Sequence, residues 1–295
     1  MIGVAGEHAV IAVLVTYRRP QAVRVMLDAL RRQTADIAHV VIVDNSPDPS
    51  ADPHDPCVTY VHCPDNPGPA GGMQVGLRAA GELSAAWEWA LLLDDDDPPL
   101  DDTAVERVLR EAWAARELDA DIQLVGLLGS RLNRWTGLLR TSRGAGRAVP
   151  VDFIGGGYLP LLHRSALRDG EGPFNPRLFW GFEELDAGLR IKARGGKVLA
   201  LDHLAQELGY WGKHDDVRTA QAGATLDRRF YSWRNALAVC RSHRLRFAAA
   251  STIARIAISG SAGLVGASGR TDRARVAWRA IRDGAGGRLG RVDPL

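Results

Sequence analysis

Short strand-like runs that alternate with helical spacing in the first third of the chain constrain its fold more than any other feature. Residues 20–32 and 73–80 show the apolar spacing of amphipathic helices and lie between these runs. Continuous apolar strands alternating with helices are typical of a parallel sheet covered on both faces, so an α/β protein is expected. The expected strands are residues 9–15, 40–43, 58–62 and 89–93.

The composition is that of an ordinary globular protein. The chain has 295 residues, 46% of them hydrophobic and 24% charged, which argues against wholesale disorder, collagen-like repeats and a polytopic membrane protein. Its cysteines, Cys57, Cys63 and Cys240, are odd in number and lack metal-ligand spacing, which argues against a disulfide framework or a zinc ribbon. The first apolar run has no basic segment before it and stops at residues 16–19, so we expect a buried strand and a cytoplasmic protein.

Four consecutive acidic residues at positions 94–97 follow the apolar run at 89–93. In open α/β sheets, ligands bind outside the carboxyl ends of the strands, so we expect the functional site there. Clustered carboxylates raise one another's pKa unless a cation neutralises them, and oxygen ligands suit Mg²⁺ or Mn²⁺ held together with substrate phosphates. The alternative is a solvated acidic turn. The position directly after an apolar strand favours the metal site.

The second half of the chain shows a less regular pattern. Residues 126–139 and 151–162 are expected to be strands separated by a mobile basic loop over residues 140–150. A helix is expected over residues 183–193, ended by two glycines, and a last strand over residues 198–201.

Charge is distributed unevenly between residues 1–227 and residues 228–295. The second stretch holds fourteen arginines against three aspartates, a balance of +11; the whole chain carries +2, which leaves −9 for the first stretch. We therefore expect an acidic catalytic domain over 1–227 and a basic helical extension over 228–295 that associates peripherally with anionic membrane. A solvated arginine-rich tail is the alternative. Nucleic acid is not an expected partner.

The order and spacing of several motifs resemble those of the inverting nucleotide-sugar glycosyltransferases of family 2. The resemblance extends from residue 10 to about residue 240 and is far more specific than an isolated DxD motif. It implies the GT-A fold, in which a Rossmann-like nucleotide-binding sheet is fused to an acceptor-binding half. Residues 211–216 and 234–235 look most like those of actinobacterial galactofuranosyl- and rhamnosyltransferases. The motifs are Val15-Thr16-Tyr17-Arg18-Arg19-Pro20, Val43-Asp44-Asn45-Ser46, residues 66–72, Leu93-Asp94-Asp95-Asp96, Phe182-Glu183-Glu184-Leu185-Asp186 with Arg190, and residues 231–235.

The resemblance implies a donor site built around the acidic run. Asp96 matches a ligand of Mn²⁺ or Mg²⁺, and Asp94 matches a residue near the metal or the ribose. Asp44 is expected to contact the nucleoside; Thr16 matches a residue near the base and diphosphate, with a strand-capping hydroxyl as its alternative. The residues implied to bind the nucleotide sugar are Thr16, Arg19, Asp44, Asn66, Gly71, Gly72, Asp94 and Asp95.

The same resemblance implies that Glu184 is the general base, which removes the proton of the acceptor hydroxyl as its oxygen attacks the anomeric carbon. The family usually has Asp at this position, and Asp186 is the second candidate. Acids in a first helical turn are also favoured by the helix dipole, which is the alternative explanation. Trp180 and Gly156 are expected to contact the acceptor, although Trp180 is equally plausible as a buried anchor.

The third metal ligand departs from the family pattern. Family members usually have a histidine at the place that corresponds here to residues 206–208, where this chain has Gln-Glu-Leu. Glu207, His203 and His214 are the three candidates.

Together, these expectations describe a metal-dependent inverting glycosyltransferase that uses a UDP-sugar. UDP-galactofuranose is the first candidate donor and dTDP-rhamnose the second; a glycan, glycolipid or small molecule would be the acceptor, as in cell wall biosynthesis. A sugar-nucleotide pyrophosphorylase and a non-catalytic binding protein are the alternatives. Residues 15–20 lack the glycine-rich basic loop expected for a triphosphate, which argues against the pyrophosphorylase.

Overall fold

The computed structural model describes residues 10–50, 55–83, 87–144, 146–211, 225–261 and 270–292. A mixed eight-stranded sheet forms its centre, and a second sheet has three short strands. The order across the large sheet is β3 (Val58–His62), β2 (Ile37–Asp44), β1 (Val10–Thr16), β4 (Trp89–Asp94), β10 (Leu161–His163), β5 (Ile122–Gly126), β11 (Lys197–Leu201) and β8 (Ala148–Pro150). The small sheet has the order β7 (Leu139–Thr141), β6 (Gly129–Leu132) and β9 (Phe153–Ile154).

The first four strands of the chain run parallel, which confirms the α/β prediction. Every residue of β1 is buried, as its continuous apolar sequence requires. In the register of the sheet, Thr16 pairs with Asp44 and Val15 pairs with Asp94. The polar ends of β1, β2 and β4 therefore meet at one edge of the sheet.

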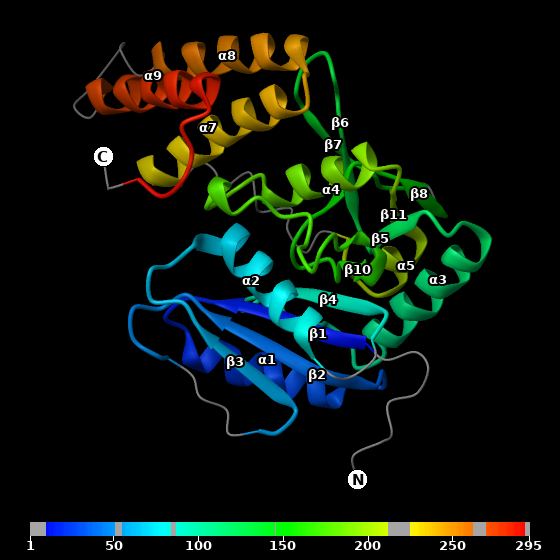
Figure 1. Cartoon of the computed structure of the whole chain (residues 1–295). Coiled ribbons are helices and arrows are strands. Elements are labelled where there is room, and N and C mark those ends of the chain that lie inside the picture. The colour runs from blue at the N-terminus through cyan, green and yellow to red at the C-terminus, as the bar shows by residue number, and fades with distance from the viewer. Residues whose placement is uncertain are drawn as a thin grey trace.

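Helices cover both faces of the large sheet (Figure 1). One core contains Met26 from α1 (Pro20–Arg32) and Val105 from α3 (Ala104–Leu118). The core on the other face contains Leu77 from α2 (Gly68–Glu82) and Ile191 from α4 (Glu183–Ala193). The polar strand ends lie beyond these two apolar layers.

Helix α2 begins at Gly68, five residues before the predicted start. Pro69 lies in the first turn of α2, where backbone N–H groups have no partner within the helix, so the missing N–H of a proline costs nothing. The glycine- and proline-rich segment therefore starts the helix and does not form a loop before it. Gly72 faces β1 so closely that an added Cβ would lie 2.7 Å from a Val15 methyl group. The absence of a side chain at this position lets the helix pack against the strand.

The strands predicted over residues 126–139 and 151–162 are wrong in extent. The first span contains β6 and is interrupted by a turn, in which the Gly137 amide bonds the Asn133 carbonyl and Gly137 has a φ of +68°. The second span contains only β9 and β10. The basic loop predicted over residues 140–150 contains all of β8 and two of the three residues of β7.

The C-terminal extension is helical, as expected, and comprises α7 (Leu226–Ser242), α8 (Arg246–Ser261) and α9 (Arg270–Gly286). These helices pack on one another at the end of the molecule away from β1–β3 (Figure 1). Leu237, Ile256 and Ala277, one from each helix, form a shared buried cluster. None of the helices within the described ranges has the length and apolar character needed to cross a membrane.

Candidate active site

A cleft of about 770 Å³ opens where the parallel strands end. Its walls come from the ends of β1 and β4, the loop before α4, the first turns of α7 and the tail after α9. Residues on both sides of the expected domain boundary at 227 therefore line it. The lining includes Thr16, Tyr17, Arg19, Asn45, Asn66, Asp94, Asp95, Asp96, Trp180, Glu183, Glu184, Asp227, Arg228, Tyr231 and Arg291.

Thr16 and Arg19 hold two residues of the acidic run in the cleft. The Thr16 hydroxyl donates to Asp95 Oδ2 over 2.7 Å. Arg19 Nη1 lies 3.0 Å from Asp95 Oδ1 and 2.9 Å from Asp96 Oδ2. The run is therefore fixed to the end of β1, and Arg19 supplies one positive charge to two carboxylates.

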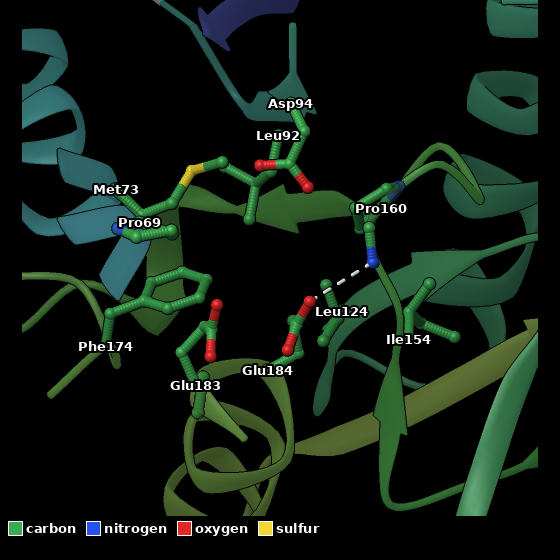
Figure 2. Close-up of a pocket in the computed structure, with 12 residues that line it drawn as sticks. Pro69, Met73, Leu92, Asp94, Leu124, Ile154, Pro160, Phe174, Glu183 and Glu184 are labelled. Carbon is green, nitrogen blue, oxygen red and sulfur yellow. Dashed lines mark hydrogen bonds between the residues drawn. The ribbon is translucent and has the colours of Figure 1, made fainter. Parts of the chain in front are cut away.

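Asp94 faces Glu183 and Glu184 across a small pocket in the floor of the cleft (Figure 2). This pocket has a volume of about 30 Å³ and is otherwise lined largely by apolar side chains such as Met73, Leu92 and Phe174. Burial and the negative charge of Glu184 raise the pKa of Asp94 to about 7. Burial also raises the pKa of Glu184, and burial with the charge of Glu184 raises that of Glu183. The floor is thus a group of carboxyl groups that resist ionisation together.

The loop before α4 aims the two glutamates at the cleft. Phe179 and Phe182 have φ angles of 67° and 69°, a left-handed backbone that is unusual for non-glycine residues. The Asn235 side-chain amide, on α7, donates to the carbonyls of residues 178, 180 and 181 over 2.8–2.9 Å. The C-terminal extension therefore stabilises a strained loop that leads directly into Glu183 and Glu184.

Several of the predicted residues do come together. Besides Thr16, Arg19 and the aspartates, Asn66 and Trp180 line the cleft. Gly156 lines the floor pocket, and its amide donates to Glu184 Oε1 over 3.4 Å, shown by the dashed line in Figure 2.

Glu183 was missed by the sequence analysis as a separate site residue. It lines both the cleft and the floor pocket, and its buried Oε2 atom has no hydrogen-bond partner within the residues that the structure describes. The acidic pair at the start of the predicted helix was the only signal, and helical spacing did not reveal that both side chains point to one pocket.

Asp44 does not lie where the sequence analysis expected it. Its carboxylate is fully buried and accepts hydrogen bonds from Ser46, Ser50 and Tyr60, so it organises the loop after β2 instead of lining the cleft. Burial alone would raise the pKa of Asp44, but these hydrogen bonds outweigh it and lower the pKa to about 2. The neighbouring Asn45 does line the cleft, and none of the described residues gives its buried Oδ1 atom a hydrogen bond.

Gly71 and Gly72 also lie apart from the cleft lining, because α2 includes them. An added Cβ on Gly71 would lie 2.5 Å from Pro67 Cβ, and Gly72 packs on β1. Their positions are explained by helix packing.

Asp186 is buried behind the cleft. Its Oδ2 accepts a hydrogen bond from Arg190 Nε over 2.6 Å, and its Oδ1 lies 2.8 Å from His243 Nε2. The second candidate for the base is therefore committed to an ion pair and a link between α4 and the end of α7.

The structure does not bring Glu207 and His203 to the cleft. Both lie on α5 (Asp202–Glu207), where Glu207 pairs with Arg107 and His203 Nε2 lies 3.8 Å from Glu111 Oε2. His214 lies outside the described residues.

The acidic run suits a divalent cation that substrate phosphates help to hold. All its donors are carboxylate oxygens. Burial, the charge of Glu184 and the charges of the neighbouring aspartates together raise the pKa of Asp94, and a bound cation would stabilise its ionised form. In the part of the chain that the structure describes, no three His, Cys, Asp or Glu side chains are grouped to hold a metal ion. Mg²⁺ and Mn²⁺ commonly take one or two carboxylates and complete their coordination with phosphate and water, so Asp94 and Asp96 fit such a role.

Comparison with known sequences gives consistent matches. The family model described as Glycosyl transferase family 2 matches residues 11–167. The galactofuranosyltransferase GlfT1 of Mycolicibacterium smegmatis is 36% identical over 203 residues, which cover 64% of this chain and 67% of that protein. The galactofuranosyltransferase GlfT1 of Mycobacterium tuberculosis is 38% identical over 95 residues, which cover 30% of this chain and 31% of that protein.

Solved structures show the same fold at low sequence identity. The first 349 residues of S. aureus TarS, in complex with UDP-GlcNAc, match with a TM-score of 0.52 and 14% identity over 93% of this chain and 81% of that one. The mannosyltransferase PcManGT of Pyrobaculum calidifontis, in complex with GDP-Man and Mn²⁺, matches with a TM-score of 0.51 and 15% identity over 95% of this chain and 87% of that one. The fold is therefore of the GT-A type.

Proposed function

Because the chain belongs to glycosyl transferase family 2 and is a glycosyltransferase, we propose that it transfers a sugar from a UDP-sugar to an acceptor hydroxyl with inversion. The observation that carries the proposal is the arrangement of Asp94 opposite Glu183 and Glu184 on the floor of the cleft. It joins a polar strand end suited to a nucleoside diphosphate with carboxylates suited to activating a hydroxyl.

In this proposal Glu184 is the general base. It lies at the start of α4 and lines both the cleft and its floor pocket, and the Gly156 amide donates to its carboxylate. The Glu184 carboxylate takes the proton of the acceptor hydroxyl as that oxygen bonds to the anomeric carbon. Its raised pKa makes it a stronger base than an exposed glutamate, but the residue must be ionised to act. Glu183, beside it, is proposed to orient the acceptor.

Donor binding is proposed to use the opposite side of the cleft. Thr16 and Arg19 fix Asp95 and Asp96. The buried Asn45 Oδ1 has no hydrogen-bond partner among the described residues and could accept a hydrogen bond from the nucleotide. We therefore propose Asn45, and no longer Asp44, as the residue that contacts the nucleoside.

We propose Asp94 and Asp96 as ligands of Mn²⁺ or Mg²⁺. The all-oxygen donor set supports this, and a protein of the same fold, PcManGT, was solved with Mn²⁺. When bound, the metal would act as a Lewis acid on the donor diphosphate and offset the charge of the departing nucleotide.

The proposed donor is UDP-galactofuranose. The 36% identical relative named as a galactofuranosyltransferase supports it over dTDP-rhamnose, which stays the second candidate. A glycan or glycolipid is the proposed acceptor class, as in cell wall biosynthesis. Family membership argues against the pyrophosphorylase and the non-catalytic alternatives.

We further propose that the protein works at the cytoplasmic face of a membrane with anionic lipids. Support comes from α8, whose outer face exposes apolar residues such as Phe247 and Ile258 at 62% and 67%. Trp135 contacts Phe247 with ring centroids 4.5 Å apart and is also exposed. Residues 228–295 also hold fourteen arginines and three aspartates, and the net positive charge of this segment would attract anionic lipid.

Nucleotide-sugar turnover tests the proposed function directly. The full chain is incubated with UDP-galactofuranose, UDP-galactopyranose, UDP-GlcNAc, dTDP-rhamnose and GDP-mannose, with Mn²⁺ or EDTA, and release of free nucleotide is measured with and without a glycan acceptor. The proposal expects Mn²⁺-dependent release from UDP-galactofuranose above all others. A clear preference for dTDP-rhamnose or GDP-mannose would overturn the donor assignment.

A further inference from the structure

Two arginines of the C-terminal extension reach the cleft, and in the described part of the chain neither has a carboxylate partner. Arg228 stands in the first turns of α7, Arg291 follows α9, and both line the cleft. Among the described residues, neither guanidinium forms an ion pair, whereas Arg19 in the same cleft is paired with Asp95 and Asp96. Arg291 Nη1 donates to the backbone carbonyl of Asp65 over 3.3 Å. Within the described ranges, the positive charge of the cleft that no carboxylate offsets therefore lies on the wall that the extension provides.

The Arg228 side chain is held against the loop before α4, the helix that carries the two glutamates. Its guanidinium lies over the Trp180 ring, 5.6 Å from the centroid. The helix end that carries it is capped by Thr225, whose hydroxyl accepts a hydrogen bond from the Arg228 amide. An arginine stacked on an aromatic ring keeps its outer N–H groups available for a planar anion.

Hydrogen bonds fix the backbone on both sides of Arg291. The Gly290 amide donates to the Arg177 carbonyl over 2.6 Å, and the buried Arg234 donates to the Gly290 carbonyl over 2.7 Å. The Val292 amide donates to the Tyr231 hydroxyl over 2.9 Å. Figure 1 shows the red tail beyond α9 running beside the first turns of α7. The tail is thus anchored at two points, and the residue between them lines the cleft.

We propose that Arg228 and Arg291 form a phosphate-binding wall that takes the diphosphate of the nucleotide-sugar donor. The inference rests on the proposed function. When the acceptor oxygen bonds to the anomeric carbon, the bond from that carbon to the diphosphate oxygen breaks and its electron pair stays on the diphosphate. Glu184 holds the acceptor proton, so the leaving nucleoside diphosphate carries one more negative charge. Two guanidinium groups with no internal carboxylate partner offset that charge.

The wall also explains why the extension is attached to the cleft. Asn235 and Arg234 on α7 bind the loop before α4 and the tail, so the helices that shape the base also position the two cations. Under this proposal the catalytic unit includes the extension, and residues 1–227 alone do not form a complete site.

Calorimetric titration of the full chain with UDP, uridine and inorganic pyrophosphate, each with Mn²⁺, tests the wall. The variants are Arg228→Ala, Arg291→Ala, the double variant and the two Arg→Lys variants. Arg275→Ala is the matched control because Arg275 is 80% exposed on α9 and pairs with Asp272 of the same helix. Each alanine variant should raise the Kd for UDP by about tenfold and leave the Kd for uridine unchanged. Lysine should restore part of the affinity, and Arg275→Ala should behave as wild type.

Unchanged UDP affinity in variants with wild-type melting temperatures would overturn the proposal. If those variants instead raise only the KM of a phosphate-bearing acceptor, the donor assignment of the wall is wrong. The wild-type protein could also bind pyrophosphate through these arginines and fail to bind UDP. That result would contradict the proposed UDP-sugar donor but would support a phosphate-binding role for Arg228 and Arg291.

Discussion

Asp186 and His243 meet behind the cleft, with Asp186 Oδ1 2.8 Å from His243 Nε2. Asp186 is 1% exposed and lies two residues after Glu184 on α4, whereas His243 follows the last residue of α7. Their contact ties the helix that carries the proposed base to the C-terminal extension. The two acids of this motif thus have different roles. Glu184 faces the cleft, and Asp186 stabilises the fold.

We predict that Asp186→Asn lowers stability more than activity. The variant loses charge-assisted bonds to Arg190 and His243, which should reduce the free energy of unfolding by about 1–3 kcal/mol. Urea unfolding measures this loss, with Asp28→Asn as the control because Asp28 is an exposed acid of α1 that pairs with Arg31. Turnover per folded molecule should stay within a few-fold of wild type. Loss of turnover at wild-type stability would instead make Asp186 the base.

Asp96→Ala should remove Mn²⁺-dependent affinity for UDP while the protein stays folded. Asp96 is 60% exposed at the end of a strand, so its loss removes a proposed ligand and no core contact. Thermal-shift titrations with UDP, with and without Mn²⁺, measure the effect through the stabilisation that a ligand gives to the folded state. An equal Mn²⁺-dependent shift in wild type and variant would show that Asp96 holds no metal.

Asp44 should contribute stability that depends on pH. Its folded pKa of about 2 lies below its ordinary value of 3.8, so the contribution is present above about pH 4 and is lost as the pH falls through about 2. Asp44→Asn should therefore be less stable than wild type at pH 7, and the difference should shrink as the pH approaches 3. Urea unfolding at several pH values checks the sign. A difference that grows on acidification would contradict the hydrogen-bonded role described for this carboxylate.

The sequence predicted the parallel half of the fold because continuous apolar runs and helical spacing are local signals. It also predicted that Thr16, Arg19 and Asp94 meet, since the carboxyl ends of parallel strands share one edge. It did not predict that Asp44 is buried among Ser46, Ser50 and Tyr60, because those contacts come from the loop after β2 and a neighbouring strand. Nor did it predict the cleft wall of the extension, which depends on tertiary contacts such as those of Asn235.

Membrane association should depend on the outer face of α8. Phe247→Glu and Ile258→Glu place a negative charge on exposed apolar positions, so they should reduce binding to anionic vesicles without affecting the core. Co-sedimentation with phosphatidylglycerol vesicles at low and high salt is the measurement, and Leu118→Glu is the control because Leu118 is 90% exposed on α3. If the wild-type protein does not bind the vesicles, or if all three variants bind them as well as wild type does, the outer face of α8 is not a membrane-binding surface.

The most direct test of the account is the turnover of Glu184→Gln with UDP-galactofuranose and a glycan acceptor. Glutamine keeps the size of the side chain and its contact with the Gly156 amide but cannot take a proton. We predict that calorimetry finds a Kd for UDP within twofold of wild type, while transfer falls by roughly 10²–10⁴-fold. Transfer near the wild-type rate would contradict the assignment of Glu184 as the base of this glycosyltransferase.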